Sequence, residues 1–189
     1  MQLFFKNIKS NTMKSFITAA IIFCSITLNA NTGKNNYSPV MTTVNPDESS
    51  LLSPLLNLYY GIKNALINSD ASLAAAKATE FSKAVKAIDM KLLSDAEMKA
   101  FMPVQDKLAA GADKIYSAKN IEAQRTNFAT LSADFYALAK AVKLSEEPVY
   151  QQYCPMKKAY WLSNETGIKN PYFGKAMLTC GSIKDTIQK

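Results

Sequence analysis

Four apolar stripes with a helical period occupy most of the sequence between residues 51 and 144. In each stripe, large apolar residues recur every three or four positions, the spacing that places them on one face of an α-helix. The stripes run through residues 51–68, 70–91, 95–118 and 121–144. Short polar connections separate them, so consecutive helices are expected to be antiparallel neighbours. The pattern predicts a mainly α fold built on an antiparallel four-helix bundle.

The residues of these stripes are the predicted core. Phenylalanines and methionines on a stripe are interpreted as packing residues, because their helical spacing already explains them. The members of the four stripes are Leu52, Leu55, Leu56, Tyr59, Ile62 and Leu66; Ala74, Ala78, Phe81, Val85 and Ile88; Met98, Phe101, Leu108, Ala112 and Ile115; and Ile121, Phe128, Leu131, Phe135, Leu138 and Val142.

Capping residues mark the starts of three of the helices. Ser69 or Asp70 can cap the second, because a short polar side chain can accept a hydrogen bond from the free backbone N–H groups there. Ser94 and Glu97 have the spacing of a capping box, which predicts the start of the third. Asn120 can cap the fourth.

Two prolines limit the helical region. Pro103 lies inside the third stripe and is expected to kink that helix or split it into two. Pro148 ends the helical region, and a small irregular or β appendix is expected to follow. Period-two patterning predicts short strands at Val149–Tyr153 and Ala159–Ser163, and Ile183–Ile187 is predicted as a third strand or a last helical turn.

The appendix, residues 148–189, is too short and too polar to hold a core of its own. Its aromatic residues Tyr150, Trp161, Tyr172 and Phe173 are therefore expected to pack against the bundle. Trp161 is the only tryptophan, and we expect a hydrogen-bond partner for its indole N–H when it is buried.

The N-terminal 30 residues have the pattern of an export signal. Basic residues through Lys14 precede an apolar run, Phe16–Leu28, that is too short to span a bilayer as a stable helix. Small residues follow, and cleavage is predicted after Ala30. Bulky Phe23 before Cys24 disfavours a lipoprotein. The prediction is a periplasmic or secreted protein with a signal at 1–30, a flexible spacer at 31–50 and one domain at 51–189.

Charge and composition argue against several classes of function. The net charge is +7, but the lysines are spread along the chain and do not form a patch interleaved with aromatic residues, so nucleic-acid binding is not expected. The chain contains no histidine, which excludes Ser-His-Asp and Cys-His catalytic arrangements and zinc sites of the histidine type. Its six glycines are scattered and form no phosphate loop. We therefore expect a protein that is not an enzyme.

Four sulfur-containing residues lie close together in the appendix. Cys154-Pro155-Met156 stands at one end of a short stretch and Met177-Leu178-Thr179-Cys180 at the other. Thiolates and thioethers are soft donors that favour Cu(I) and related ions over Mg²⁺ or Ca²⁺. Met177 and Cys180 would meet on one side if their segment makes a single helical turn. The candidate metal ligands are therefore Cys154, Met156, Met177 and Cys180.

A second interpretation of the same residues stays open. Two cysteines in an exported chain commonly form a disulfide, and methionine is a common core filler. Cys154 and Cys180 could then be joined in a structural or interaction domain that binds no metal. The spacing of two cysteines does not distinguish these alternatives.

The appendix also contains four short blocks whose order resembles an uncharacterised family of domains of unknown function. The blocks are Tyr-Cys-Pro-Met at 153–156, Tyr-Trp-Leu-Ser at 160–163, Ile-Lys-Asn-Pro-Tyr-Phe-Gly at 168–174 and Met-Leu-Thr-Cys-Gly at 177–181. The resemblance extends over roughly residues 55–187. Many relatives have histidine where this chain has Tyr153.

The resemblance implies a setting for the sulfur residues. Members of this family occur as small exported proteins and as C-terminal extensions of periplasmic adaptor subunits of copper and silver efflux systems. That setting favours a binding module for Cu(I) or Ag(I). It also implies a partner, either a metal-efflux adaptor or another exported metal-handling protein.

Overall fold

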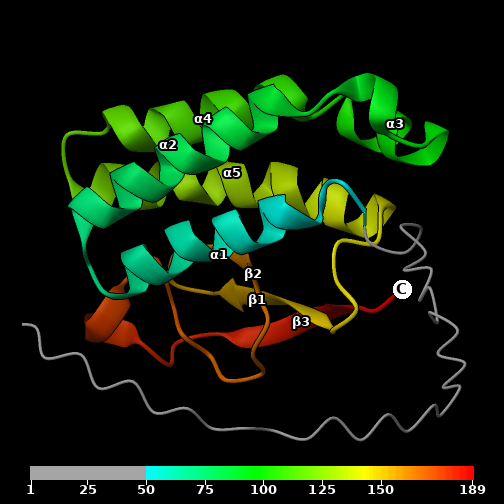
Figure 1. Ribbon diagram of the computed structural model, residues 1–189. Coiled ribbons are helices and arrows are strands. Elements are labelled where there is room, and N and C mark those ends of the chain that lie inside the picture. Colours follow the sequence, from blue (N-terminus) through cyan, green and yellow to red (C-terminus); the bar gives the residue numbers. More distant parts are fainter. Residues whose placement is uncertain (1–49) are drawn as a thin grey trace, which may run out of the picture. The chain divides into compact units, whose positions relative to one another are not determined.

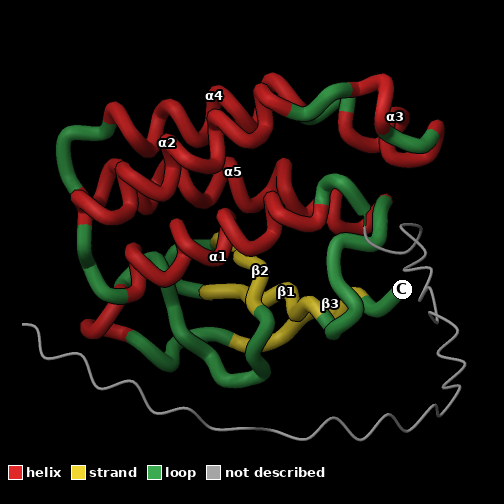
Figure 2. The backbone as a smooth tube through the Cα atoms, in the orientation of Figure 1, coloured by secondary structure: helices red, strands yellow, loops and turns green. Residues whose placement is uncertain are grey.

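The computed structural model describes residues 50–189, in which five α-helices precede a small antiparallel sheet (Figures 1 and 2). The mainly helical fold with a β appendix agrees with the sequence prediction. The elements in chain order are α1 (Ser53–Ile67), α2 (Ala71–Ala87), the 3₁₀ helix η1 (Met90–Leu92), α3 (Asp95–Phe101), α4 (Gln105–Ser117), α5 (Ile121–Ala141), β1 (Val149–Cys154), β2 (Ala159–Ser163), the 3₁₀ helix η2 (Gly174–Met177) and β3 (Ser182–Ile187).

Each predicted capping position is used. Asp70 accepts a hydrogen bond from the backbone N–H of Leu73 at 2.8 Å and starts α2. Ser94 and Glu97 form both bonds of a capping box at the start of α3. The side chain of Asn120 caps α5. These local hydrogen bonds satisfy backbone donors that the first helical turn leaves free, which is why the starts could be predicted from local sequence.

The third predicted helix, residues 95–118, is not continuous. α3 ends at Phe101 and α4 begins at Gln105, with Pro103 between them. Proline has no N–H to donate and its ring crowds the preceding turn, so the chain breaks there. Of the two outcomes expected at Pro103, a kink or a split, the structure has the split, and the predicted count of four helices was therefore wrong.

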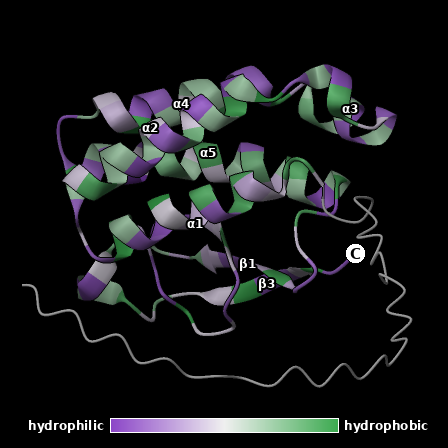
Figure 3. Ribbon diagram, in the orientation of Figure 1, coloured by the Kyte–Doolittle hydropathy of each residue, from purple (hydrophilic) through white to green (hydrophobic). Residues whose placement is uncertain are grey.

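The four long helices α1, α2, α4 and α5 pack against one another. α1 packs against α2, α2 against α4, and α4 against α5. Buried apolar residues of these helices form one core, and Figure 3 shows hydrophobic and hydrophilic residues alternating along the helices. At the centre, the Tyr59 ring stacks between Phe128 and Phe135, at centroid distances of 5.2 and 4.9 Å. All but three of the predicted stripe residues are buried, and the three exceptions, Ile88, Met98 and Ile121, pack at the edge of the same core.

The sheet has the strand order β2-β1-β3, and both pairings are antiparallel. Tyr153 pairs with Tyr160 on β2 and with Ser182 on β3. The two strands predicted before residue 164 are confirmed, and the segment around residues 183–187 is a strand and not a helical turn. α5 packs against β2, so the sheet lies on the opposite side of α1 and α5 from α2 and α4 (Figure 1).

Buried hydrogen bonds join the sheet to the helical layer. The Tyr59 hydroxyl lies 2.7 Å from the Ser132 hydroxyl on α5 and accepts the backbone N–H of Leu162 on β2 at 3.0 Å. The Lys63 ammonium on α1 donates to the Ser163 hydroxyl at 3.3 Å. Because buried polar groups are costly when unpaired, these bonds fix the position of β2 on the helices.

The aromatic residues of the appendix complete the core. Trp161 and Tyr172 are buried and meet edge to face at 5.8 Å, and Tyr172 also contacts Phe128. The predicted packing of the appendix against the core is therefore confirmed for Trp161, Tyr172 and Phe173, whereas Tyr150 is not part of the core. The expectation for the indole of Trp161 was wrong, because its N–H has no acceptor among the described residues.

No helix within residues 50–189 has the length and apolar character needed to cross a membrane. The predicted signal, its cleavage site and nearly all of the predicted spacer lie outside the described residues.

Phe135 tests the predicted core. The Phe135→Ala variant should unfold with a free energy about 3–5 kcal/mol lower than that of the wild type, because the ring is fully buried and stacked on Tyr59. Urea denaturation measures this difference. Leu92→Ala is the control, since Leu92 is 68% exposed and its truncation should change stability by less than about 0.5 kcal/mol. Equal effects of the two substitutions would contradict the assignment of the core.

Lys63 should make stability depend on pH. Its side chain is 2% exposed, and burial lowers its pKa to about 8, an effect that the nearby Glu165 carboxylate partly offsets. Between pH 8 and the normal lysine pKa of about 10.5 the unfolded chain binds more protons than the folded one, so this residue's contribution to stability rises with pH. The stability of the wild type relative to Lys63→Met should therefore increase from pH 8 to pH 10.

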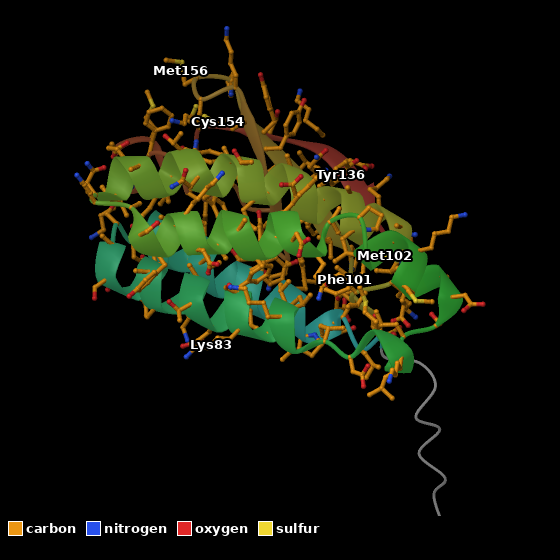
Figure 4. All side chains as sticks on the ribbon, turned by 90° about the horizontal axis from the view of Figure 1, so that it is seen from above. Lys83, Phe101, Met102, Tyr136, Cys154 and Met156 are labelled. Atoms are coloured by element: carbon orange, nitrogen blue, oxygen red, sulfur yellow. The ribbon has the colours of Figure 1, made fainter. Side chains whose placement is uncertain are left out.

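Urea denaturation of both proteins at several pH values measures this effect. The exposed Lys83 on α2 provides the control (Figure 4), and Lys83→Met should leave the pH dependence as it is in the wild type. A difference between wild type and Lys63→Met that stays constant from pH 7 to pH 10 would contradict the prediction.

Candidate metal centre

Cys154 ends β1 and lies beneath the turn that leads into β2. Its side chain is fully buried. The turn consists of residues 155–158, and its backbone N–H at Lys157 donates to the Cys154 sulfur at a distance of 3.4 Å. Lys158 completes the turn with a φ of 55°. This hydrogen bond ties the sulfur to the backbone of the turn that covers it.

Cys180 lies next to Cys154 at the same end of the sheet. It comes two residues before Ser182, the first residue of β3, and Ser182 pairs with Tyr153, the residue before Cys154 on β1. Both thiols are free. The pKa of the Cys180 thiol is raised by burial, by the charge of Cys154 and by a hydrogen bond between the two thiols. The structure therefore brings the two predicted cysteine ligands into contact.

Asn170 holds the segment that carries Cys180. Its side chain is fully buried and donates from Nδ2 to the backbone oxygen of Cys180 at 2.7 Å. Its Oδ1 accepts the N–H of Tyr172 at 2.8 Å, and its own N–H donates to the backbone oxygen of Leu178 at 2.8 Å. One buried amide thus links both ends of the loop 170–180 and sets the position of Cys180.

Gly181 allows this segment to pack closely on the sheet. A Cβ atom at this position would lie 2.9 Å from the Trp161 ring and 3.0 Å from the backbone oxygen of Tyr153. Its φ of 156° is also unfavourable for other residues. The residue after Cys180 must therefore be glycine for the segment to lie against Trp161.

Arg125 anchors the other end of the loop. This buried side chain donates to the backbone oxygen of Pro171 at 3.1 Å and to the Ser69 hydroxyl at 3.0 Å, and it pairs with Glu122 at 2.6 Å. Gly174 fits beside it, because a Cβ there would lie 2.7 Å from the guanidinium. The start of α5, the end of α1 and the loop are thus joined at one point.

Sequence reasoning did not assign these supporting roles. Asn170 and Gly174 were recognised only as parts of a recurring block, and Arg125, the single arginine of the chain, was assigned no role. An arginine among so many lysines was the one available signal, since its planar group can bind several acceptors at once.

The two predicted methionine ligands lie at the surface. Met156 is 64% exposed in the turn after Cys154, and Figure 4 shows it at the outer edge of the molecule. Met177 is 38% exposed at the end of η2. The backbone N–H of Cys180 donates to the oxygen of Met177 at 3.1 Å, so these residues form the single turn that was expected. The thioethers flank the thiol pair, and both remain in contact with solvent.

The donor set available for a metal ion consists of sulfur. Within residues 50–189 there is no group of three or more cysteine, aspartate or glutamate residues that could hold an ion. A metal at this position would therefore be held by the two thiolates, with thioethers as the only further protein donors. That set suits a soft monovalent ion that accepts a low coordination number, and it does not suit Mg²⁺ or Ca²⁺.

Comparison with known proteins gives a family match for the helical part of the chain. No curated protein and no solved structure matches the sequence. A family match does exist, and it begins within α1 and ends just before β1, so it does not include the cysteines. Residues 55–147, just under half of the chain, match the family described as "Protein of unknown function (DUF3347)".

Proposed function

We propose that this protein is an exported module that binds a soft metal ion, Cu(I) or Ag(I), through Cys154 and Cys180. The observation that carries the proposal is the contact between two free thiols at one end of the sheet. In this proposal Met156 and Met177 add thioether donors at the rim of the site. The role is binding and not catalysis, as expected from a chain without histidine.

The local chemistry supports such a site. The backbone N–H of Lys157 donates to the Cys154 sulfur at 3.4 Å and so helps to hold this donor in place. Each thiol must lose its proton before it can bind a metal ion as a thiolate. Burial and the neighbouring Cys154 raise the pKa of Cys180 and so oppose this loss. A positive ion placed between the sulfurs would reverse that unfavourable interaction, so metal binding and thiol deprotonation are coupled.

Flexibility and exposure make the two methionines the proposed further donors. Methionine is unbranched and has three rotatable side-chain bonds. Met156 lies two residues after Cys154, and Met177 lies in the same turn as Cys180. Their exposure means that no packing has to be broken before they turn toward a bound ion.

The wider setting of the module is part of the proposal. We propose that α1, α2, α4 and α5 serve as an antiparallel four-helix bundle that supports the site. The motif blocks resemble those of exported proteins and of extensions of copper and silver efflux adaptors. A metal-efflux adaptor or another exported metal-handling protein is accordingly the proposed partner.

Cu(I) titration of the reduced protein tests the metal site. The wild type should bind one Cu(I) per chain, and the Met156→Leu/Met177→Leu variant should bind it at least about tenfold more weakly, because leucine keeps the volume and removes the thioethers. The matched control is Met90→Leu/Met102→Leu, which changes two methionines remote from the cysteines and should bind like the wild type. Competition with a colourimetric Cu(I) chelator measures the affinities.

Two results would contradict the proposal in different ways. If the Cys154→Ser/Cys180→Ser variant binds Cu(I) as tightly as the wild type, the thiol pair is not the site. If the methionine variant binds Cu(I) as tightly as the wild type while the cysteine variant does not, the thiols hold the metal alone and the proposed role of the thioethers is wrong.

The same thiol contact favours a second function, that of a structural or interaction domain closed by a Cys154–Cys180 disulfide. Joining the two positions would stabilise the fold by about 3 kcal/mol on the chain-entropy model. Under this alternative, Cys154→Ser should lower the melting temperature of the oxidised protein, whereas Met156→Leu/Met177→Leu should not change it. Calorimetry of oxidised and reduced samples measures both effects. Equal melting temperatures for oxidised wild type and Cys154→Ser would exclude a stabilising disulfide.

A further inference from the structure

Exposed apolar side chains are concentrated in the chain segments that adjoin the two thiols. They belong to two segments, the turn 155–158 and the segment 175–184, which together are called the thiol rim below. Ten large apolar side chains are exposed in the described part of the chain, and four of them lie in these two short segments. The four are Met156, Met177, Leu178 and Ile183. Clustered apolar exposure of this kind marks interaction surfaces more often than isolated exposed residues do.

The charges of the thiol rim all have one sign. The two segments contain four lysines and no aspartate or glutamate; the lysines are Lys157, Lys158, Lys175 and Lys184. Within residues 50–189 none of the four forms an ion pair. Lys157 donates to the Thr126 hydroxyl at 3.2 Å, and Lys184 lies over the Tyr153 ring. The rim therefore presents a positive charge that the protein does not itself neutralise.

We propose that the thiol rim is a docking surface for a metal-carrying protein whose own site is surrounded by acidic residues. The proposal rests on the proposed function, because it names the partner from which the thiol pair would receive its metal. The apolar side chains would be covered in the complex, and the lysines would face the partner's carboxylates. Opposite charges of this kind mainly raise the rate of association and set orientation.

The placement of the two thiols suits transfer between proteins. Cys154 is fully buried, whereas Cys180 is half-buried and lies within the rim. An incoming ion would meet Cys180 and the exposed thioethers first and Cys154 last. In the transfer, Cu(I) leaves the donor's ligands and is bound by the two thiolates, whose protons pass to solvent. Docking at the rim brings donor and acceptor sulfurs together without opening the core.

The lysines could instead serve only the bound metal. Two thiolates and one Cu(I) carry a net charge of −1, which nearby lysines would stabilise. That explanation predicts a lysine effect on affinity for Cu(I) from any source. Docking predicts an effect on transfer rate that depends on the charge of the donor, so the two explanations can be separated.

The experiment uses two synthetic Cu(I)-loaded peptides as probes. Both carry the same methionine donors; one has flanking aspartates and the other flanking serines. Stopped-flow spectroscopy measures transfer to the reduced full chain. At low salt the acidic peptide should transfer at least about tenfold faster than the neutral one, and this ratio should fall toward one as salt is raised.

Charge variants complete the test. Changing Lys157, Lys158, Lys175 and Lys184 to glutamine should abolish the preference for the acidic peptide while leaving transfer from the neutral peptide within about twofold. The control changes four lysines elsewhere, Lys83, Lys91, Lys107 and Lys114, to glutamine and should keep the preference. Circular dichroism checks that both variants are folded, and the salt dependence of the wild type tests the proposal without any variant.

Three outcomes would overturn the inference. Equal rates from both peptides at low salt would show that charge does not guide docking. An equal loss of transfer from both peptides in the rim variant would assign the lysines to the bound metal. Binding of the wild type, but not of the rim variant, to phosphatidylglycerol vesicles, without a preference between the peptides, would make the rim a membrane-binding surface.

Failure of the proposed function would look different. In that case the reduced protein would take up Cu(I) from neither peptide. Binding of the metal-free peptides, measured by fluorescence anisotropy, would still test docking: tighter binding of the acidic peptide to the wild type than to the rim variant supports it, and equal binding overturns it.

Discussion

The hydroxyl of Tyr59 joins three elements on which the rest of the structure depends. It bonds with Ser132 on α5 and accepts the N–H of Leu162 on β2, while its ring stacks between two phenylalanines. The appendix is too small to bury a core alone, so its strands are ordered only as far as the helices hold them. Fixing β2 in turn fixes β1 and the end of the sheet where Cys154 lies. Burial raises the pKa of Tyr59, so the hydroxyl keeps its proton over the whole physiological range and the bonds persist.

The motif blocks divide into residues that could bind metal and residues that position them. Asn170, Gly174 and Gly181 carry no soft donor, yet each fits a place where another residue would lose a hydrogen bond or overlap a neighbour. Together with Arg125 they hold the loop 170–180 against the helices and the sheet. A thiol pair needs such support, because two sulfurs that repel as thiolates stay adjacent only if the backbone around them is fixed. The supporting residues therefore belong to the proposed site as much as the cysteines do.

Local features of the sequence predicted more than long-range ones. Asp70, Ser94 and Asn120 cap helices through bonds to residues only three positions away, so their roles could be inferred from spacing. The sequence left open whether Cys154 and Cys180 form a disulfide or bind a metal ion. Their proximity depends on how the strands pair. The roles of Lys63 and Arg125 could not be inferred at all. Lys63 bonds to Ser163, 100 residues away, and Arg125 bonds to Pro171, 46 residues away. From sequence, a lysine in a helix is expected to face solvent. Only the fold shows that Lys63 is buried.

Disulfide formation and metal binding would compete for the same two sulfur atoms. A disulfide removes both thiolates, so an oxidised protein would lose its proposed metal donors, and a bound soft ion would protect the pair from oxidation. The structure favours neither state by geometry alone, because the thiols are free and adjacent. The difference between the cysteines matters more. Cys154 is buried beneath its turn, while Cys180 is accessible, so oxidants and metal donors alike must reach Cys180 first. We infer that the surface around Cys180 decides which chemistry the pair undergoes, and that surface is the positively charged, apolar rim.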